Sequence, residues 1–139
     1  MKSPVLLATT GLLMASIAFA DTAPPALAES PASSSKYAIE YKTSSEALAA
    51  LKKKKGVSIR EENDWFVIND QSENAIWSIA TENSRAYPTM VKRVVYEKDK
   101  SLMVSLEINC GADKATCDEV ASVFKQINEQ VRNAMNQKL

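Results

Sequence analysis

The most reactive side chains of this 139-residue chain are two thiols, Cys110 and Cys117, which have six residues between them. Redox enzymes more often place two cysteines in a Cys-x-x-Cys motif at the start of a helix, where both sulfurs share a lowered thiol pKa. The wider spacing favours a structural disulfide, which an oxidising compartment would maintain. In the chain-entropy description, such a short closed loop contributes about 2 to 3 kcal/mol of stability.

The remaining candidates for catalysis are carboxylates and lysines, because the chain contains no histidine. Histidine is the commonest general base and transition-metal ligand, so most hydrolase sites are excluded. Glu61, Glu62, Asp64 and Asp70 gather around predicted turns, where acidic residues are ordinary, and they do not follow calcium-loop spacing. With only three glycines, no phosphate-binding loop is indicated. We therefore expect no catalytic centre, no metal and no cofactor.

One stretch of the chain combines the aromatic and cationic side chains that dominate protein–protein contacts. Tyr87 precedes a proline, which favours an extended backbone that can present its ring. Lys92 and Arg93 are neighbours in a predicted strand and should point to opposite faces. The candidate partner-binding residues are Trp77, Arg85, Tyr87, Lys92 and Arg93. The alternative is that Tyr87 packs over the sheet edge and that the cations are solvated strand residues.

The first twenty residues have the organisation of a secretory signal peptide. Lys2 supplies a positive start, an apolar run extends over residues 5–19, and Ala18-Phe19-Ala20 gives the small-x-small cleavage pattern. The apolar run is shorter than the roughly 20 residues that cross a bilayer. We therefore expect residues 1–20 to be removed, the mature chain to begin at Asp21, and the product to be periplasmic or secreted.

The rest of the chain divides into a leader and one domain. Residues 21–35 are rich in alanine, proline and serine and predict a flexible leader. Residues 36–139 suffice for a single hydrophobic core. The formal net charge is zero, whereas nucleic-acid binding requires a cationic excess, so no nucleic-acid partner is expected. No second apolar run is long enough to form an integral membrane segment.

Alternating apolar residues between turn-forming segments predict an antiparallel β-meander. The strands are expected at residues 57–61, 65–68, 76–80, 90–96 and 102–108. In the last of these, apolar and polar residues alternate, so one face is buried. The residues from Trp65 to Ile68 are apolar on both faces, which favours a central strand or one covered on both sides.

Two helices are expected to flank the meander. A short strand at residues 37–41 leads into the first helix, for which Thr43 and Glu46 form a capping box and Gly56 provides a left-handed stop. The second helix is predicted at residues 117–137, with an apolar stripe at helical spacing and a capping box of Thr116 and Glu119. The predicted fold class is α+β, an antiparallel meander of about five strands with a short N-terminal helix and a long C-terminal helix packed on the sheet.

Several short motifs resemble a group of known sequences. They are Trp77-Ser78, Ala86-Tyr87-Pro88, Val91-Lys92-Arg93 and the C-terminal cysteine pair. In these motifs the chain resembles small uncharacterised exported proteins of Gram-negative bacteria. The resemblance implies export and a disulfide, and it transfers no catalytic residue. The order of helix, meander and helix is also similar to several small binding and chaperone-like α+β domains, including secretion chaperones, which is an analogy of fold alone.

These observations favour a non-enzymatic interaction module that contacts a protein partner in the cell envelope. One alternative is an inhibitor or immunity-type protein that blocks an envelope hydrolase by inserting the Cys110–Cys117 loop, since preorganised loops bind effectively. Another is a small enzyme with a carboxylate or lysine base, for which Glu61, Glu62 and Asp70 are the candidates. An exposed Trp65 or Trp77 on an uncovered sheet face would mark a binding site, because large uncovered apolar patches are uncommon.

Overall fold

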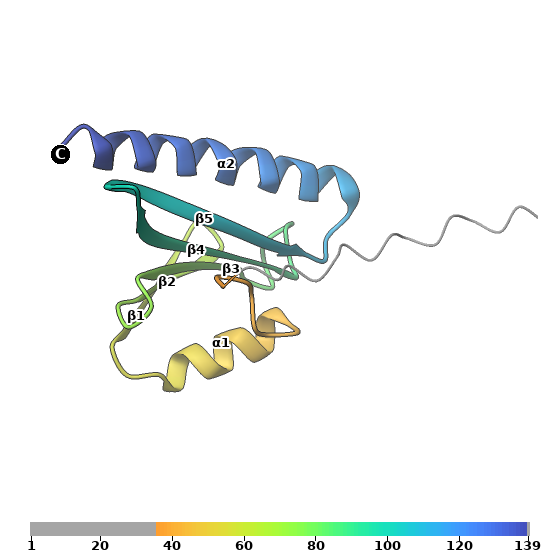
Figure 1. Ribbon diagram of the computed structural model, residues 1–139. Helices are drawn as coiled ribbons and strands as arrows, with labels where there is room; N and C mark the ends of the chain where they lie inside the picture. The colour runs from red at the N-terminus through yellow and green to blue at the C-terminus, as the bar shows by residue number, and fades with distance from the viewer. Residues whose placement is uncertain (1–35, 139) are drawn as a thin grey trace, which may run out of the picture. The chain divides into compact units, whose positions relative to one another are not determined.

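The computed structural model describes residues 36–138, which form one five-stranded antiparallel sheet between two helices (Figure 1). The strands lie side by side in chain order, so the sheet is a simple meander. This confirms the predicted α+β fold. The predicted signal peptide and leader lie outside the described residues. The elements are α1 Ser44–Lys53, β1 Val57–Glu62, β2 Trp65–Asp70, β3 Ala75–Ala80, β4 Thr89–Lys98, β5 Ser101–Cys110 and α2 Lys114–Asn136.

Tight turns explain why consecutive strands pair with each other. Asn63 and Asp64 join β1 to β2 and have φ angles of 51° and 61°. Asp99 and Lys100 join β4 to β5 and have φ angles of 51° and 60°. Two-residue turns with positive φ at both positions match the right-handed twist of the flanking strands, and Asn and Asp tolerate this conformation well. The turns therefore fix the register of both hairpins.

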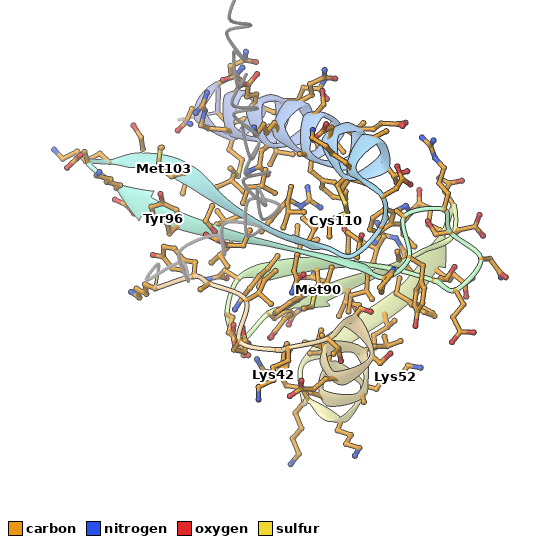
Figure 2. All side chains as sticks on the ribbon, turned by 90° about the vertical axis from the view of Figure 1, so that its right-hand side faces the viewer. Lys42, Lys52, Met90, Tyr96, Met103 and Cys110 are labelled. Carbon is orange, nitrogen blue, oxygen red and sulfur yellow. A yellow bond between two sulfur atoms is a disulfide. The ribbon has the colours of Figure 1, made fainter. Side chains whose placement is uncertain are left out.

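Helix α1 covers one face of the sheet and completes the larger part of the core. Thr43 caps it as predicted by accepting a hydrogen bond from the Glu46 amide at 3.1 Å. The carboxylate of Glu46 accepts from the Lys42 amide, one residue before the expected position. The buried side chains that meet beneath α1 are Ala47, Leu51, Ile68, Ala75, Trp77, Ile79, Met90 and Val94. Figure 2 shows Met90 on this side of the sheet, toward α1.

The strand predicted at residues 37–41 is absent, and this prediction is wrong. The segment is irregular, yet Tyr37, Ile39 and Tyr41 still pack against the core beneath α1. The ring of Tyr37 stacks on Tyr96 at 4.8 Å, and the ring of Tyr41 lies 5.5 Å from Trp77. The alternating pattern therefore arises because the segment lies across buried side chains, and it forms no strand of the ladder.

Helix α2 begins three residues earlier than predicted, at Lys114, because its cap is Asp113 rather than Thr116. The Asp113 carboxylate accepts hydrogen bonds from the amide and the hydroxyl of Thr116, at 3.0 and 2.7 Å. These bonds lower the pKa of Asp113. The predicted capping box is thus displaced by a stronger carboxylate cap one turn upstream.

Helix α2 lies along β5 and is held at both ends (Figure 1). At its start the predicted disulfide joins Cys110 to Cys117, with a Cα–Cα distance of 5.8 Å, and Figure 2 shows Cys110 beside the first turn of the helix. At its end the Asn136 amide exchanges two hydrogen bonds of 3.0 Å with the backbone of Leu102. Within residues 36–138, no helix is long and apolar enough to cross a membrane.

Candidate functional site

A groove separates α2 from the sheet. Helix α2 packs chiefly on β5, and its Val120 and Phe124 reach Ala80 and Trp65, so the same face of β1 and β2 is only partly covered by it. The space between them has a volume of about 460 Å³, which is within the usual range of about 300 to 1,000 Å³ for ligand sites. Both walls come from regular elements, so the groove is present before any ligand binds.

The groove is largely apolar. Trp65 and Val67 form its floor on β2, while Val123 and Ile127 extend from the facing side of α2. Phe124 reaches across from α2 and contacts Trp65 edge to face, with ring centroids 5.6 Å apart. Val123 is 45% exposed, although its neighbour Phe124 is buried. Such side chains gain by contact with a ligand, because covering them removes apolar surface from water.

One cation lies within this apolar surface without a counter-ion. The Arg93 guanidinium lies 5.6 Å from the centre of the Phe124 ring. Its Nε is buried and has no hydrogen-bond partner, and among the described residues no carboxylate pairs with it. Burial lowers the pKa of Arg93, but an arginine remains protonated in proteins. The groove therefore holds an uncompensated positive charge.

The other charged residues of the groove are already paired. Arg60 contacts Glu62 at 3.2 Å on one rim, and Arg85 pairs with Glu119 on the other. These pairs are well exposed and contribute little to stability. They leave Arg93 as the residue that sets the charge preference of the groove.

The five predicted partner-binding residues do not form one surface. Lys92 and Arg93 lie on opposite faces, as predicted: Lys92 is on the face of α1, and Arg93 is on the face of α2. Trp77 is completely buried beneath α1, and Lys92 is 5% exposed. These two residues cannot contact a partner directly, which corrects the sequence-based selection.

Tyr87 is 38% exposed, but it lines a different hollow, beside Ser44 and Ser45 at the start of α1. Its bond to Pro88 is cis. Of the predicted set, only Arg85 and Arg93 lie in the groove.

Lys92 belongs to a polar cluster on the face of α1. Its Nζ lies 5.0 Å from the centre of the Trp77 ring, donates to Glu40 at 2.8 Å, and pairs with Glu73 at 3.2 Å. Its Nζ also donates to the Ala38 carbonyl, so Lys92 attaches the irregular segment 36–42 to the sheet.

Lys54 extends this cluster by pairing with Asp70 and Glu73. Burial opposes the charge of Lys54 and of Lys92, but the carboxylate partners outweigh it and raise the pKa of both lysines. Neither lysine is therefore a general base near neutral pH. Burial also opposes the charge of Asp70, yet hydrogen bonds from Lys54 and Ser72 lower the pKa of this carboxyl.

The carboxylates considered for catalysis are also separated. Glu62 pairs in register with Trp65 and lies with it at the groove, whereas Asp70 is fully buried on the face of α1. Glu61 is exposed next to Glu62 and, by strand alternation, points to the other face. The structure does not bring these residues together as an acid–base pair.

The Cys110–Cys117 loop is half helical, since its residues from Lys114 onward form the first turn of α2. The part before the helix is held close to the domain: the Gly111 amide donates to the Pro88 carbonyl at 2.7 Å. A Cβ on Gly111 would lie 2.8 Å from that oxygen, so glycine is required by the close approach. The loop is therefore a packed corner of the fold.

The sequence named Trp65 as a mark of a binding site if its sheet face were uncovered, but it missed the rest of the apolar lining, including Val67, Val123 and Phe124. Two signals pointed to it: β2 is apolar on both faces although one face is only partly covered, and Arg93 interrupts the apolar pattern of the α2 face of β4. Within residues 36–138, no group of three or more acidic or cysteine side chains is placed to hold a metal ion. No family model, characterised protein or solved structure matches this chain.

Proposed function

We propose that this protein is a non-enzymatic binding module of the cell envelope, and that the groove between α2 and the sheet holds a short segment of a protein partner. The observation that carries the proposal is the groove itself, in which half-buried apolar side chains and the exposed Val123 lie between a helix and a sheet. Export to the periplasm follows from the predicted signal peptide, and the disulfide is compatible with an oxidising compartment.

The energetics favour binding without catalysis. Apolar surface is available for burial at about 25 cal/mol per Å². The charged residues at the rim are ion-paired, so they are suited to orienting a ligand rather than to proton transfer. A groove that exists beforehand also reduces the ordering cost of association.

Val123→Glu tests the proposal because Val123 is exposed, so the substitution places a charge in the groove at little cost to folding. The matched control is Gln126→Glu, which adds the same charge to α2 at an exposed position outside the groove lining. Each protein would be immobilised, and proteins retained from an envelope extract would be compared.

We expect a partner that is retained by the unchanged protein and by Gln126→Glu and is lost with Val123→Glu. A partner retained equally by all three proteins would show that the groove is not the binding site. Activity on an envelope substrate in the absence of any retained partner would contradict the non-enzymatic proposal.

A further inference from the structure

We propose that the segment bound in the groove is a peptide that carries a carboxylate among apolar residues, and that Arg93 binds this carboxylate. The inference rests on the proposed function, because it specifies what the groove selects. It is carried by the position of the Arg93 guanidinium, which lies against Phe124 in the groove with its Nε buried and unpartnered.

The charge balance of the groove requires an anion. Five charged residues line it, and four of them form the two rim pairs, Arg60 with Glu62 and Arg85 with Glu119. The remaining charge is that of Arg93. The buried Nε of Arg93 has no partner, which is unfavourable, whereas a carboxylate accepts two parallel hydrogen bonds from a guanidinium. A ligand with one carboxylate would therefore neutralise the groove.

An anion alone would not match the apolar walls of the groove. An inorganic anion would pair with Arg93 but leave Trp65 and Val123 uncovered. A fatty acid would cover these side chains, but its hydrocarbon chain has no groups for the ion-paired rims. A peptide supplies all three: apolar side chains for the walls, a carboxylate for Arg93, and backbone N–H and C=O groups for the rims.

The experiment is a binding screen on an array of N-acetylated octapeptides with randomised sequence, probed with the disulfide-bonded protein. Arg93→Gln removes the charge, and Arg132→Gln is the matched control, because Arg132 is exposed on α2 outside the groove. The best acidic peptide would then be titrated beside the same peptide with its acidic residue changed to the amide, and beside dodecanoate. Thermal unfolding of each variant would verify that it is folded.

We expect retained peptides to be enriched in Asp or Glu next to aliphatic or aromatic residues, for the unchanged protein and for Arg132→Gln alike. Binding of the acidic peptide should be roughly 10- to 100-fold weaker to Arg93→Gln, as for loss of a charge-assisted hydrogen bond. The amide form of the peptide should be weakened similarly with the unchanged protein and should be insensitive to Arg93→Gln.

Three results would overturn the inference. Retention of apolar peptides without preference for an acid, unaffected by Arg93→Gln, would leave the proposed function intact and remove Arg93 from recognition. Tight binding of dodecanoate with no peptide retained would assign the groove to a lipid carboxylate and contradict the proposed function too. Retention of neither probe would show that the groove is no carboxylate site.

Discussion

Replacing Arg93 by methionine should stabilise the protein while weakening its binding of acidic peptides. Methionine retains an unbranched apolar stem of similar length, so the contact with Phe124 and the packing of the groove floor are kept. What is removed is a charge that has no counter-ion among the described residues and whose Nε is buried without a hydrogen bond.

The magnitude follows from two opposing terms. A buried polar group without a partner costs about 1 to 3 kcal/mol. The contact between the guanidinium and the Phe124 ring stabilises the folded state by about 0.5 to 1 kcal/mol. The free energy of unfolding should therefore rise by about 1 kcal/mol, which for a domain of this size corresponds to a Tm increase of about 4 to 8 °C.

Thermal unfolding followed by far-UV circular dichroism, with urea titration as a second measurement, would test this prediction. Arg85→Met is the matched control, because Arg85 lies on the exposed rim and is paired with Glu119. Its Tm should stay the same or fall slightly, since exposed ion pairs contribute about 0 to 1 kcal/mol. A lower Tm for Arg93→Met would refute the reasoning, because it would mean that the Arg93 charge is already satisfied within the protein.

Three further changes test the rest of the fold. Asp70→Asn should lower the free energy of unfolding by about 1 to 3 kcal/mol, because it removes the buried carboxylate that accepts hydrogen bonds from Lys54 and Ser72, while Lys54 keeps its pair with Glu73; urea titration would measure this loss. Since the folded-state pKa of Asp70 is lowered, its contribution is present above the ordinary carboxyl pKa of about 4 and is lost as the pH falls through the lower folded value. The Tm of the unchanged protein should therefore fall in acid more steeply than that of Asp70→Asn. An equally steep fall of Tm for both proteins would contradict the stabilising role of the Asp70 carboxylate. Replacing both Cys110 and Cys117 by serine should cost about 2 to 3 kcal/mol, and an unchanged urea midpoint would show that the disulfide adds no stability. Asp113→Ala should lower the Tm through loss of the α2 cap, and an unchanged Tm would show that the cap is dispensable.

Most of the sheet could be predicted from the sequence because its signals are local. Strand alternation and the Asn63-Asp64 turn each depend on a few consecutive residues, and all five strands were found with ends within two residues of those observed. The two errors had competing local causes. Thr116 was predicted as the cap of α2, although the Asp113 carboxylate is a stronger hydrogen-bond acceptor. The alternating apolar pattern of residues 37–41 reflects the burial of their side chains and not the pairing of a strand.

The site could not be predicted in the same way, because its members are distant in the chain. Trp65, Arg93 and Val123 line one groove only because α2 packs chiefly on β5 and leaves part of the same face of β2 uncovered. The sequence placed Lys92 and Arg93 on opposite faces, but it could not show which face is closed by α1. Trp77, chosen for its type, lies on the closed face and is completely buried.

Helix α2 is fixed to β5 by a covalent bond at Cys117 and by the Asn136 amide at its other end, while Val123 and Ile127 between these points face the groove. A helix attached at both ends cannot swing outward to admit a larger ligand. Selection by this groove should therefore be steric as well as electrostatic, because a peptide segment wider than the groove cannot enter it. Association should accordingly proceed in a single kinetic step, without a preceding opening of the protein.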